Sequence, residues 1–102
     1  MNTEIDAEEF FERLVGPLTF ATFMVAARTS MDLTQAQMGK LFGVSKTMVC
    51  DIEKGRQSVS PKLAYKIARK AQLSEQLAVM LCLQDQLNRA KIKMTVSVEK
   101  AS

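Results

Sequence analysis

Chemically versatile residue types are scarce in this chain, which has no histidine and only two cysteines among its 102 residues. Without histidine, a zinc site would lack ligands and general base catalysis would lack its commonest side chain. No glycine-rich phosphate-binding loop is present, and neither Cys50 nor Cys82 has a neighbour in sequence that would activate its thiol. Asp51 and Glu53 are two residues apart on a predicted helix, so their carboxylates diverge rather than form a catalytic pair. We therefore expect no enzyme, no metal site and no cofactor.

Long apolar runs and targeting signals are missing as well. No apolar stretch reaches the roughly 18 residues of a membrane span, and the N-terminus lacks the basic and apolar stretches of a signal peptide. We therefore expect a cytoplasmic protein with no membrane partner. Its two cysteines would then be reduced, with a structural disulfide as the alternative. The length allows one domain with a modest core, and the many Met, Leu, Ala and Gln residues favour helix.

The net charge of +3 is unevenly distributed along the chain. Residues 1–18 carry five acids and one arginine (−4), residues 19–70 carry nine bases and three acids (+6), and residues 71–102 carry four bases and three acids (+1). Taken alone, the basic middle segment would best be interpreted as a solvated face. Beside the motif that it contains, it is the electrostatic pattern expected for phosphate contact.

That motif lies in residues 33–55, LTQAQMGKLFGVSKTMVCDIEKG, where two short helices are predicted on either side of a tight turn. Thr34 can cap the first helix, and Gln37 can return the hydrogen bond in a capping box. Gly43 stands where a left-handed residue would end that helix, and Ser45 is placed to cap the second. The arrangement is a helix-turn-helix.

The second helix has one apolar face and one polar face. Met48, Val49 and Ile52 form the apolar stripe, and Gly55 ends the helix. The opposite face carries Lys46, Thr47, Cys50, Asp51 and Lys54. A short helix of this kind can be anchored to a core on one side while its polar side chains reach base edges in a major groove.

In these residues the sequence resembles the Cro/CI-type (XRE-like) helix-turn-helix family of bacterial and phage regulators. The resemblance spans roughly residues 20–70. It rests on several positions that match together: Thr34-Gln35, Gly43-Val44-Ser45, Val49, Glu53, Gly55 and Ile67-Ala68.

The resemblance implies roles for particular residues. The residues at base-reading positions are Lys46, Thr47 and Asp51, with Cys50 on the same face. The candidates for phosphate contact are Gln35, Ser45 and Lys54. Arg56 is a further candidate from its position at the end of the recognition helix, although a solvated loop residue explains it nearly as well. Arg28 and Glu53 match a family ion pair that ties the first core helix to the recognition helix. The alternative for this pair is an exposed one, worth only about 0–1 kcal/mol.

Two departures from the family pattern have consequences. Gly39 stands where the family usually has alanine, and it should loosen the first helix of the motif by about 0.5–1 kcal/mol. Lys46, Thr47 and Asp51 replace the glutamines of well-known members, so the operator sequence cannot be transferred.

The remaining helices are predicted from their caps and apolar spacing. Thr19, Ser60 with Pro61, and Ser74 each mark a helix start. The predicted fold is all-α: a five-helix Cro/CI-type bundle with an extra acidic N-terminal helix. Its parts are residues 1–18 (N-terminal helix), 19–72 (DNA-binding domain) and 73–102 (dimerisation or partner binding), within one compact unit.

The C-terminal part suggests an association surface. In the last helix, Val79 and Leu83 lie off the main apolar stripe and could face a partner, or the helix could be covered by its neighbours. Residues 92–99 alternate with a period of two, which predicts a strand. A lone strand should pair between subunits or with another protein's sheet, and a disordered end is the alternative. The interface candidates are Val79, Leu83, Ile92, Met94, Val96 and Val98.

Two functional hypotheses follow. The first is a sequence-specific repressor that binds double-stranded DNA at a palindromic operator as a homodimer, and is nucleoid-associated when bound. The second is the antitoxin of a type II toxin–antitoxin pair that represses its own operon. Residues 16–20, 50–61 and 83–90 resemble antitoxins of this group that neutralise mRNA-cleaving toxins, and the acidic N-terminus could cover a basic toxin. A pure protein-interaction module would leave the polar face of the second helix unexplained.

Overall fold

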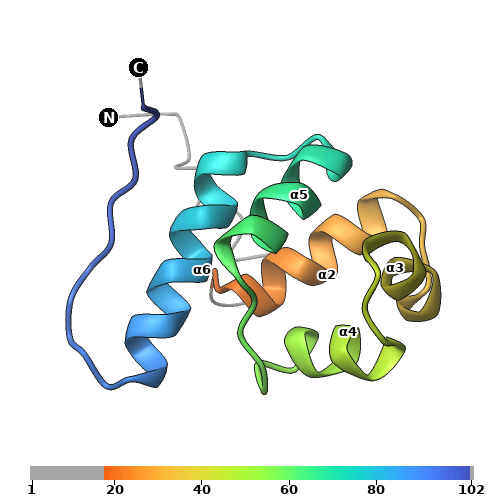
Figure 1. The fold of residues 1–102 in the computed structure, drawn as a ribbon, viewed down its shortest axis with the longest axis horizontal. Helices are drawn as coiled ribbons and strands as arrows, with labels where there is room; N and C mark the ends of the chain where they lie inside the picture. Colours follow the sequence, from red (N-terminus) through yellow and green to blue (C-terminus); the bar gives the residue numbers. More distant parts are fainter. Residues whose placement is uncertain (1–17, 102) are drawn as a thin grey trace, which may run out of the picture.

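A computed structural model describes residues 18–101 of the chain (Figure 1). Within this range the fold consists of five α-helices and no strand, which confirms the predicted all-α bundle. The helices are α2 (Phe20–Ser30), α3 (Gln35–Phe42), α4 (Lys46–Glu53), α5 (Pro61–Ala71) and α6 (Glu75–Arg89). The helix predicted within residues 1–18 lies outside the described residues, apart from Leu18. None of the five helices is long and apolar enough to cross a membrane.

Each of these helices begins at a hydroxyl side chain that the sequence analysis singled out. The capping residues are Thr19, Thr34, Ser45, Ser60 and Ser74, and each hydroxyl accepts a hydrogen bond from the backbone N–H three residues later. Thr34 and Gln37 form the expected capping box. Caps of this kind typically stabilise a helix by about 1 kcal/mol. The helix starts are therefore set by local chemistry.

A single apolar core connects the helices. α2 packs across α4, α5 and α6, while α3 packs on α4 and α5 packs on α6. Small residues allow the helices to approach closely, since Ala27, Ala64, Ala68 and Ala78 are fully buried. The other buried apolar residues are Phe20, Phe23, Met24, Met38, Val49, Ile52, Val59, Ile67, Leu81 and Cys82. Because α6 contributes to this core, it belongs to the same packed unit as the helix-turn-helix.

The strand predicted over residues 92–99 is wrong. Residues 92–101 form no strand and run back along α6 as an uncoiled chain (Figure 1). The amide of Gln84 supplies what a second strand would have supplied: its Nε2 donates to the Met94 carbonyl (2.9 Å), and its Oε1 accepts from the Val96 N–H (2.8 Å). Gln76 Nε2 donates to the Val98 carbonyl. Helix side chains thus replace part of the backbone ladder that a strand requires.

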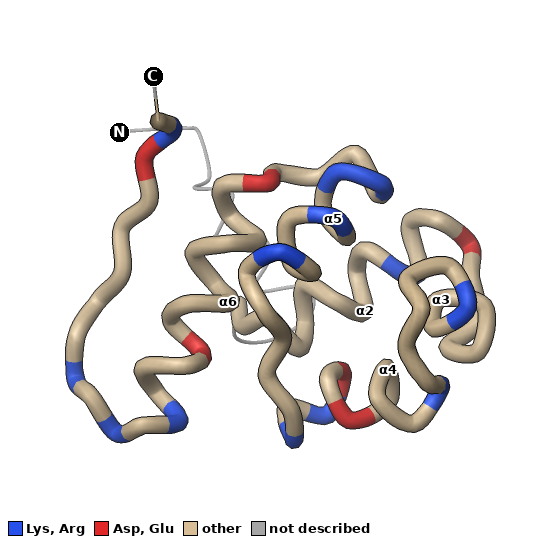
Figure 2. Tube along the Cα trace, viewed as in Figure 1, with Lys and Arg blue, Asp and Glu red and all other residues tan. Residues whose placement is uncertain are grey.

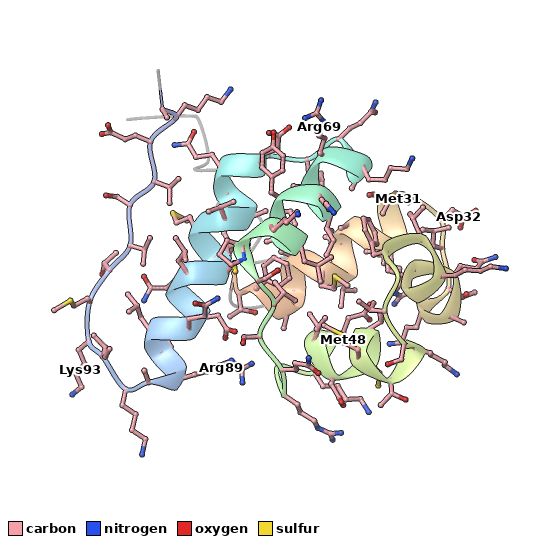
Figure 3. The ribbon with its side chains drawn as sticks, viewed as in Figure 1. Met31, Asp32, Met48, Arg69, Arg89 and Lys93 are labelled. Atoms are coloured by element: carbon pink, nitrogen blue, oxygen red, sulfur yellow. The ribbon has the colours of Figure 1, made fainter. Side chains whose placement is uncertain are left out.

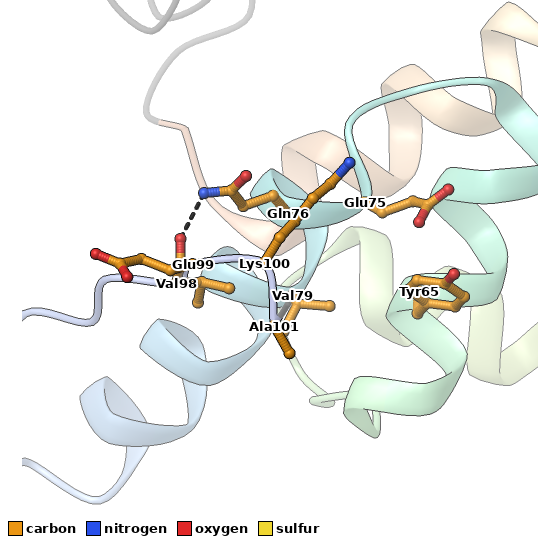
Figure 4. A pocket seen from close by; sticks show the side chains of 8 residues that line it. All are labelled: Tyr65, Glu75, Gln76, Val79, Val98, Glu99, Lys100 and Ala101. Carbon is orange, nitrogen blue, oxygen red and sulfur yellow. Dashed lines mark hydrogen bonds between the residues drawn. The ribbon is translucent and has the colours of Figure 1, made fainter.

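The alternation of apolar and polar residues over 92–99 still determines part of the packing of this segment. Val96 and Val98 are half-buried, whereas the predicted interface residues Ile92 and Met94 are 42% and 67% exposed. Val98 and Val79 line the same open pocket, of about 410 Å³ (Figure 4). The chain's own C-terminal segment therefore covers part of the α6 face that the sequence assigned to a partner.

α6 also holds the loop that follows α4. Arg89 Nη2 donates to the Gly55 carbonyl over 2.7 Å, although the two residues are 34 positions apart. The Val59 carbonyl accepts from Gln86 Nε2 (3.1 Å) and from the Cys82 thiol (3.1 Å). The C-terminal half of α6 therefore fixes the path of the chain after α4. It does so through Cys82, Gln86 and Arg89, which lie in consecutive turns of the helix.

Raising the pH is expected to weaken the fold through Cys82. Burial raises the pKa of this thiol and the nearby Asp85 carboxylate raises it further, while a hydrogen bond with Gln86 acts in the opposite direction. With a raised folded-state pKa, the thiol's contribution to stability is complete below its unfolded pKa of about 8.5. It is lost as the pH rises through the folded value. Melting curves between pH 7 and 10 should therefore show a smaller loss for Cys82→Ala than for the parent protein.

Cys50→Ala is the matched control, because it removes the other free thiol, which is only half-buried. It should follow the parent protein across this pH range. Equal losses for Cys82→Ala and the parent would contradict the assignment of the pH effect to Cys82.

Candidate nucleic-acid interface

The turn between α3 and α4 is built from residues 43–45. Gly43 ends α3 in the left-handed conformation, with φ 72° and ψ 31°. Val44 N–H then donates to the Gly39 carbonyl (2.9 Å), and Ser45 Oγ accepts from Met48 N–H (2.9 Å) to start α4. Because each bond spans three to five residues, this geometry follows from the local sequence.

Gly39 has a packing role that sequence reasoning missed. A Cβ at this position would lie 2.5 Å from the Val44 carbonyl oxygen and 3.2 Å from the Ser45 carbonyl carbon. The glycine therefore lets α3 approach the backbone of the turn more closely than alanine would. The expected loosening of α3 is accompanied by tighter contact between the two helices of the motif.

α4 is amphipathic, as its sequence predicted. Val49 and Ile52 are fully buried, and Met48 packs against the core from a half-buried position (Figure 3). The candidate base-reading residues lie on the outer surface of this helix. Lys46 and Thr47 are exposed at its N-terminal end, while Cys50 and Asp51 are half-buried one turn later.

The candidate phosphate-contacting residues lie at both ends of the helix pair. Gln35 is the first residue of α3, and Ser45 is the capping residue of α4. Lys54 is the capping residue at the C-terminal end of α4, and Arg56 follows in the loop. The Arg56 side chain is 67% exposed, and its Nη1 lies 3.8 Å from Asp51 Oδ1. Two residues with different predicted roles are thus neighbours.

Arg28 and Glu53 form a two-pronged ion pair between α2 and α4. Arg28 Nε lies 2.7 Å from Glu53 Oε2, and Arg28 Nη2 lies 3.1 Å from Glu53 Oε1. Their side chains are only 19% and 6% exposed, so the alternative of an exposed pair does not fit. The bond to Glu53 raises the pKa of Arg28. This guanidinium therefore stays charged.

The same pair reaches two further segments. Arg28 Nη1 donates to the Leu33 carbonyl (2.9 Å), just before α3. Glu53 Oε1 also accepts from Gln35 Nε2 (3.1 Å), at the start of α3. One carboxylate at the end of α4 thereby orients α2, the loop before α3 and α3 itself.

The basic charge is divided between two sides of the molecule. Lys46, Lys54 and Arg56 lie on or beside α4. By contrast, Arg69 and Lys70 lie in the last turn of α5, on the side away from α4 (Figures 2 and 3), and Lys66 lies one turn earlier. They line an open groove of about 640 Å³ together with Leu41, Phe42 and Gln72. The excess of +6 in residues 19–70 therefore overstates the positive charge beside α4.

Comparison with known proteins agrees with this geometry. A family model for helix-turn-helix proteins matches residues 25–77, just over half of the chain. The chain is also 43% identical, over 42 residues, to an uncharacterised HTH-type transcriptional regulator of Archaeoglobus fulgidus. That alignment covers 41% of this chain and 59% of the relative, so the chain spans about three fifths of the relative's length. No solved structure matches the chain.

Glu53→Ala is expected to lower the free energy of unfolding by about 3 kcal/mol, because it leaves the largely buried Arg28 charge without its partner. Urea denaturation would measure the loss. Asp85→Ala is the control, since it removes the carboxylate of a more exposed pair (35% and 25% exposed side chains) with Arg89. That substitution should cost less than about 1 kcal/mol. Similar losses for both variants would argue against a structural role for the Arg28–Glu53 pair.

Gly39→Ala is expected to lower the free energy of unfolding by about 1 kcal/mol, even though alanine is the better helix former by a similar amount. The added Cβ meets the Val44 carbonyl, which is backbone and cannot rotate away. At Gly43 nothing lies within 4 Å of an added Cβ, so only its left-handed backbone constrains the residue. Gly43→Asn should therefore be tolerated better than Gly43→Ala. A stabilised Gly39→Ala variant would refute the close-approach explanation.

Proposed function

This chain belongs to the XRE/Cro-type helix-turn-helix family of DNA-binding transcriptional regulators, and we propose that it is a repressor that binds a palindromic operator as a homodimer. The observation that carries the proposal is the construction of α4. Its inner face is buried in the core through Val49 and Ile52, while Lys46 and Thr47 stand exposed at its N-terminal end. A helix held in this way can enter a major groove with its first residues leading.

The base-reading side chains have complementary chemistry. Lys46 can donate to guanine O6 and N7, and Thr47 offers a hydroxyl together with a methyl group that suits thymine. Asp51 can accept from cytosine N4–H. Cys50 lies on the same outer surface and would contact the groove wall. These four residues carry the specificity in our proposal.

Phosphate contacts at both ends would fix the register of α4 in the groove. The Gln35 amide has two N–H groups, and its bond to Glu53 leaves the second one for a phosphate oxygen. The free backbone N–H groups at the start of α3 favour an anion at the same place. At the other end, Lys54 and Arg56 would contact the backbone. The long, exposed Arg56–Asp51 pair is worth little and can open on binding.

A homodimer would place two α4 helices in successive major grooves. Their half-sites would lie about 34–36 Å apart, one turn of the duplex, and the operator would share the protein's two-fold symmetry. Binding at a promoter would repress transcription by occlusion.

A second candidate function is that of an antitoxin that neutralises an mRNA-cleaving toxin and represses its own operon. Two of the segments that resemble such antitoxins, residues 50–61 and 83–90, contact each other through Arg89–Gly55 and Gln86–Val59 hydrogen bonds. The two segments that resemble antitoxins are therefore adjacent in the fold, although they are separate in the sequence. Co-purification with the product of an adjacent gene would favour this function.

The decisive experiment is a titration of the protein into a fluorescent duplex that carries its own upstream region, against a scrambled duplex, at two salt concentrations. Preferential binding that weakens with salt is expected. Lys46→Ala and Thr47→Ala should each relax the preference at one base pair by about 1–3 kcal/mol. Gln35→Ala should weaken binding to all sequences alike, because a phosphate contact carries no sequence information.

Lys93→Ala is the matched control, since it removes an exposed lysine from the C-terminal segment rather than from α4. It should bind as the parent protein does. If the Lys46, Thr47 and Gln35 variants all matched this control on every duplex, α4 would not be the reading helix. Melting curves of each variant would separate lost contacts from lost folding.

A further inference from the structure

The side chains on one edge of α6 bind the backbone of an extended chain. Gln84 donates to one peptide group and accepts from another, on either side of Thr95. Gln76, eight residues earlier in α6, donates to the Val98 carbonyl. Eight helical residues span about 12 Å, and the three extended residues from 95 to 98 span about 10 Å. The two glutamines are therefore spaced to hold a chain that runs antiparallel to the helix.

We call Gln76, Val79 and Gln84 the glutamine edge of α6, and residues 94–98 the strap that it holds. The hydrogen bonds reach only backbone atoms of the strap, so they would be the same for any chain in this conformation. Selectivity comes from the half-buried Val96 and Val98, the latter in the same pocket as Val79 (Figure 4). A chain with branched apolar residues at alternate positions fits this edge.

The link between α6 and the strap leaves apolar side chains uncovered, although its backbone is hydrogen-bonded. Lys91 N–H donates to the Asn88 carbonyl (3.0 Å), and Ile92 N–H donates to the Leu87 carbonyl (2.9 Å). Lys91 has φ 60°, a left-handed conformation that a residue with a Cβ rarely adopts. Ile92 and Met94, which flank the reversal of the chain, are 42% and 67% exposed. The closed form therefore combines one left-handed residue with two exposed apolar side chains, in the short segment where the chain turns back.

We propose that two copies of this chain exchange their straps, so that residues 94–98 of each copy bind the glutamine edge of the other. The inference rests on the proposed homodimer and names the surface that forms it. A second copy is the occupant that the chemistry selects, because its strap is identical to the segment already seated there. Exchange requires the Lys91 turn and its two backbone hydrogen bonds to open, and it would bring the exposed Ile92 and Met94 of the two links together. The receiving surface is a helix, and no strand pairs with a strand.

A complementation experiment tests the exchange with full-length protein. The edge-defective variant, Gln76→Ala/Gln84→Ala, keeps an intact strap, and the strap-defective variant, Val96→Asp/Val98→Asp, keeps an intact edge. Each variant alone should elute as a monomer in size-exclusion chromatography with light scattering, whereas the parent should be a dimer. An equimolar mixture should recover a heterodimer with one exchanged strap, identified by native mass spectrometry. A mixture that stays monomeric, or a parent that is monomeric at every concentration, would overturn the proposal.

Gln57→Ala is the matched control, because it removes an exposed glutamine outside the edge and should remain as dimeric as the parent.

Deleting Lys91 and Ile92 gives an independent test, since a shortened link cannot turn the chain back onto its own helix. That deletion should lower the apparent dissociation constant of the dimer at least 10-fold, and unchanged dimerisation would count against exchange. The edge-defective variant should still bind a duplex with a single half-site as the parent does. If neither this variant nor the parent preferred the half-site duplex to a scrambled one, the proposed function would fail instead.

Discussion

The carboxylate of Glu53 is the group on which the geometry of the interface depends. It ends α4, the helix proposed to read DNA, and it accepts hydrogen bonds from Arg28 in α2 and Gln35 in α3. Arg28 in turn holds the Leu33 carbonyl that precedes α3. The orientation of α4 relative to both preceding helices is therefore set at one largely buried point. A buried charge pair keeps its geometry because separating the charges would leave each without compensation.

The rest of the molecule keeps α4 and the loop after it in place. At its start, α4 is capped by Ser45, and the absence of a side chain at Gly39 brings α3 against the turn. Beyond its end, Arg89 reaches back from α6 to the Gly55 carbonyl. A reading helix anchored at both ends presents its polar side chains in one arrangement, which lowers the entropy lost when it binds. In this protein the last helix adds to that rigidity through its hydrogen bonds to Gly55 and Val59.

The C-terminal segment illustrates how a correct local pattern can lead to a wrong element. Its period of two predicted an extended chain with one apolar side, and Val96 and Val98 are indeed the half-buried members. A strand, however, is defined by its hydrogen-bonding partner, and here the partners are the glutamines of α6 rather than another backbone. In a similar way, summing charge over residues 19–70 could not separate the bases beside α4 from those at the end of α5.

The sequence by itself determined the helices, their starting residues, the turn at Gly43 and the inner and outer faces of α4. All of these depend on contacts within three to five residues, which the order of amino acids specifies directly. Only the tertiary structure decided that the Arg28–Glu53 pair is largely buried, and that α6 holds both the loop after α4 and the C-terminal segment. These contacts join residues as many as 34 positions apart. No local sequence pattern predicts such a contact, because the two residues meet only once the core has brought the helices together.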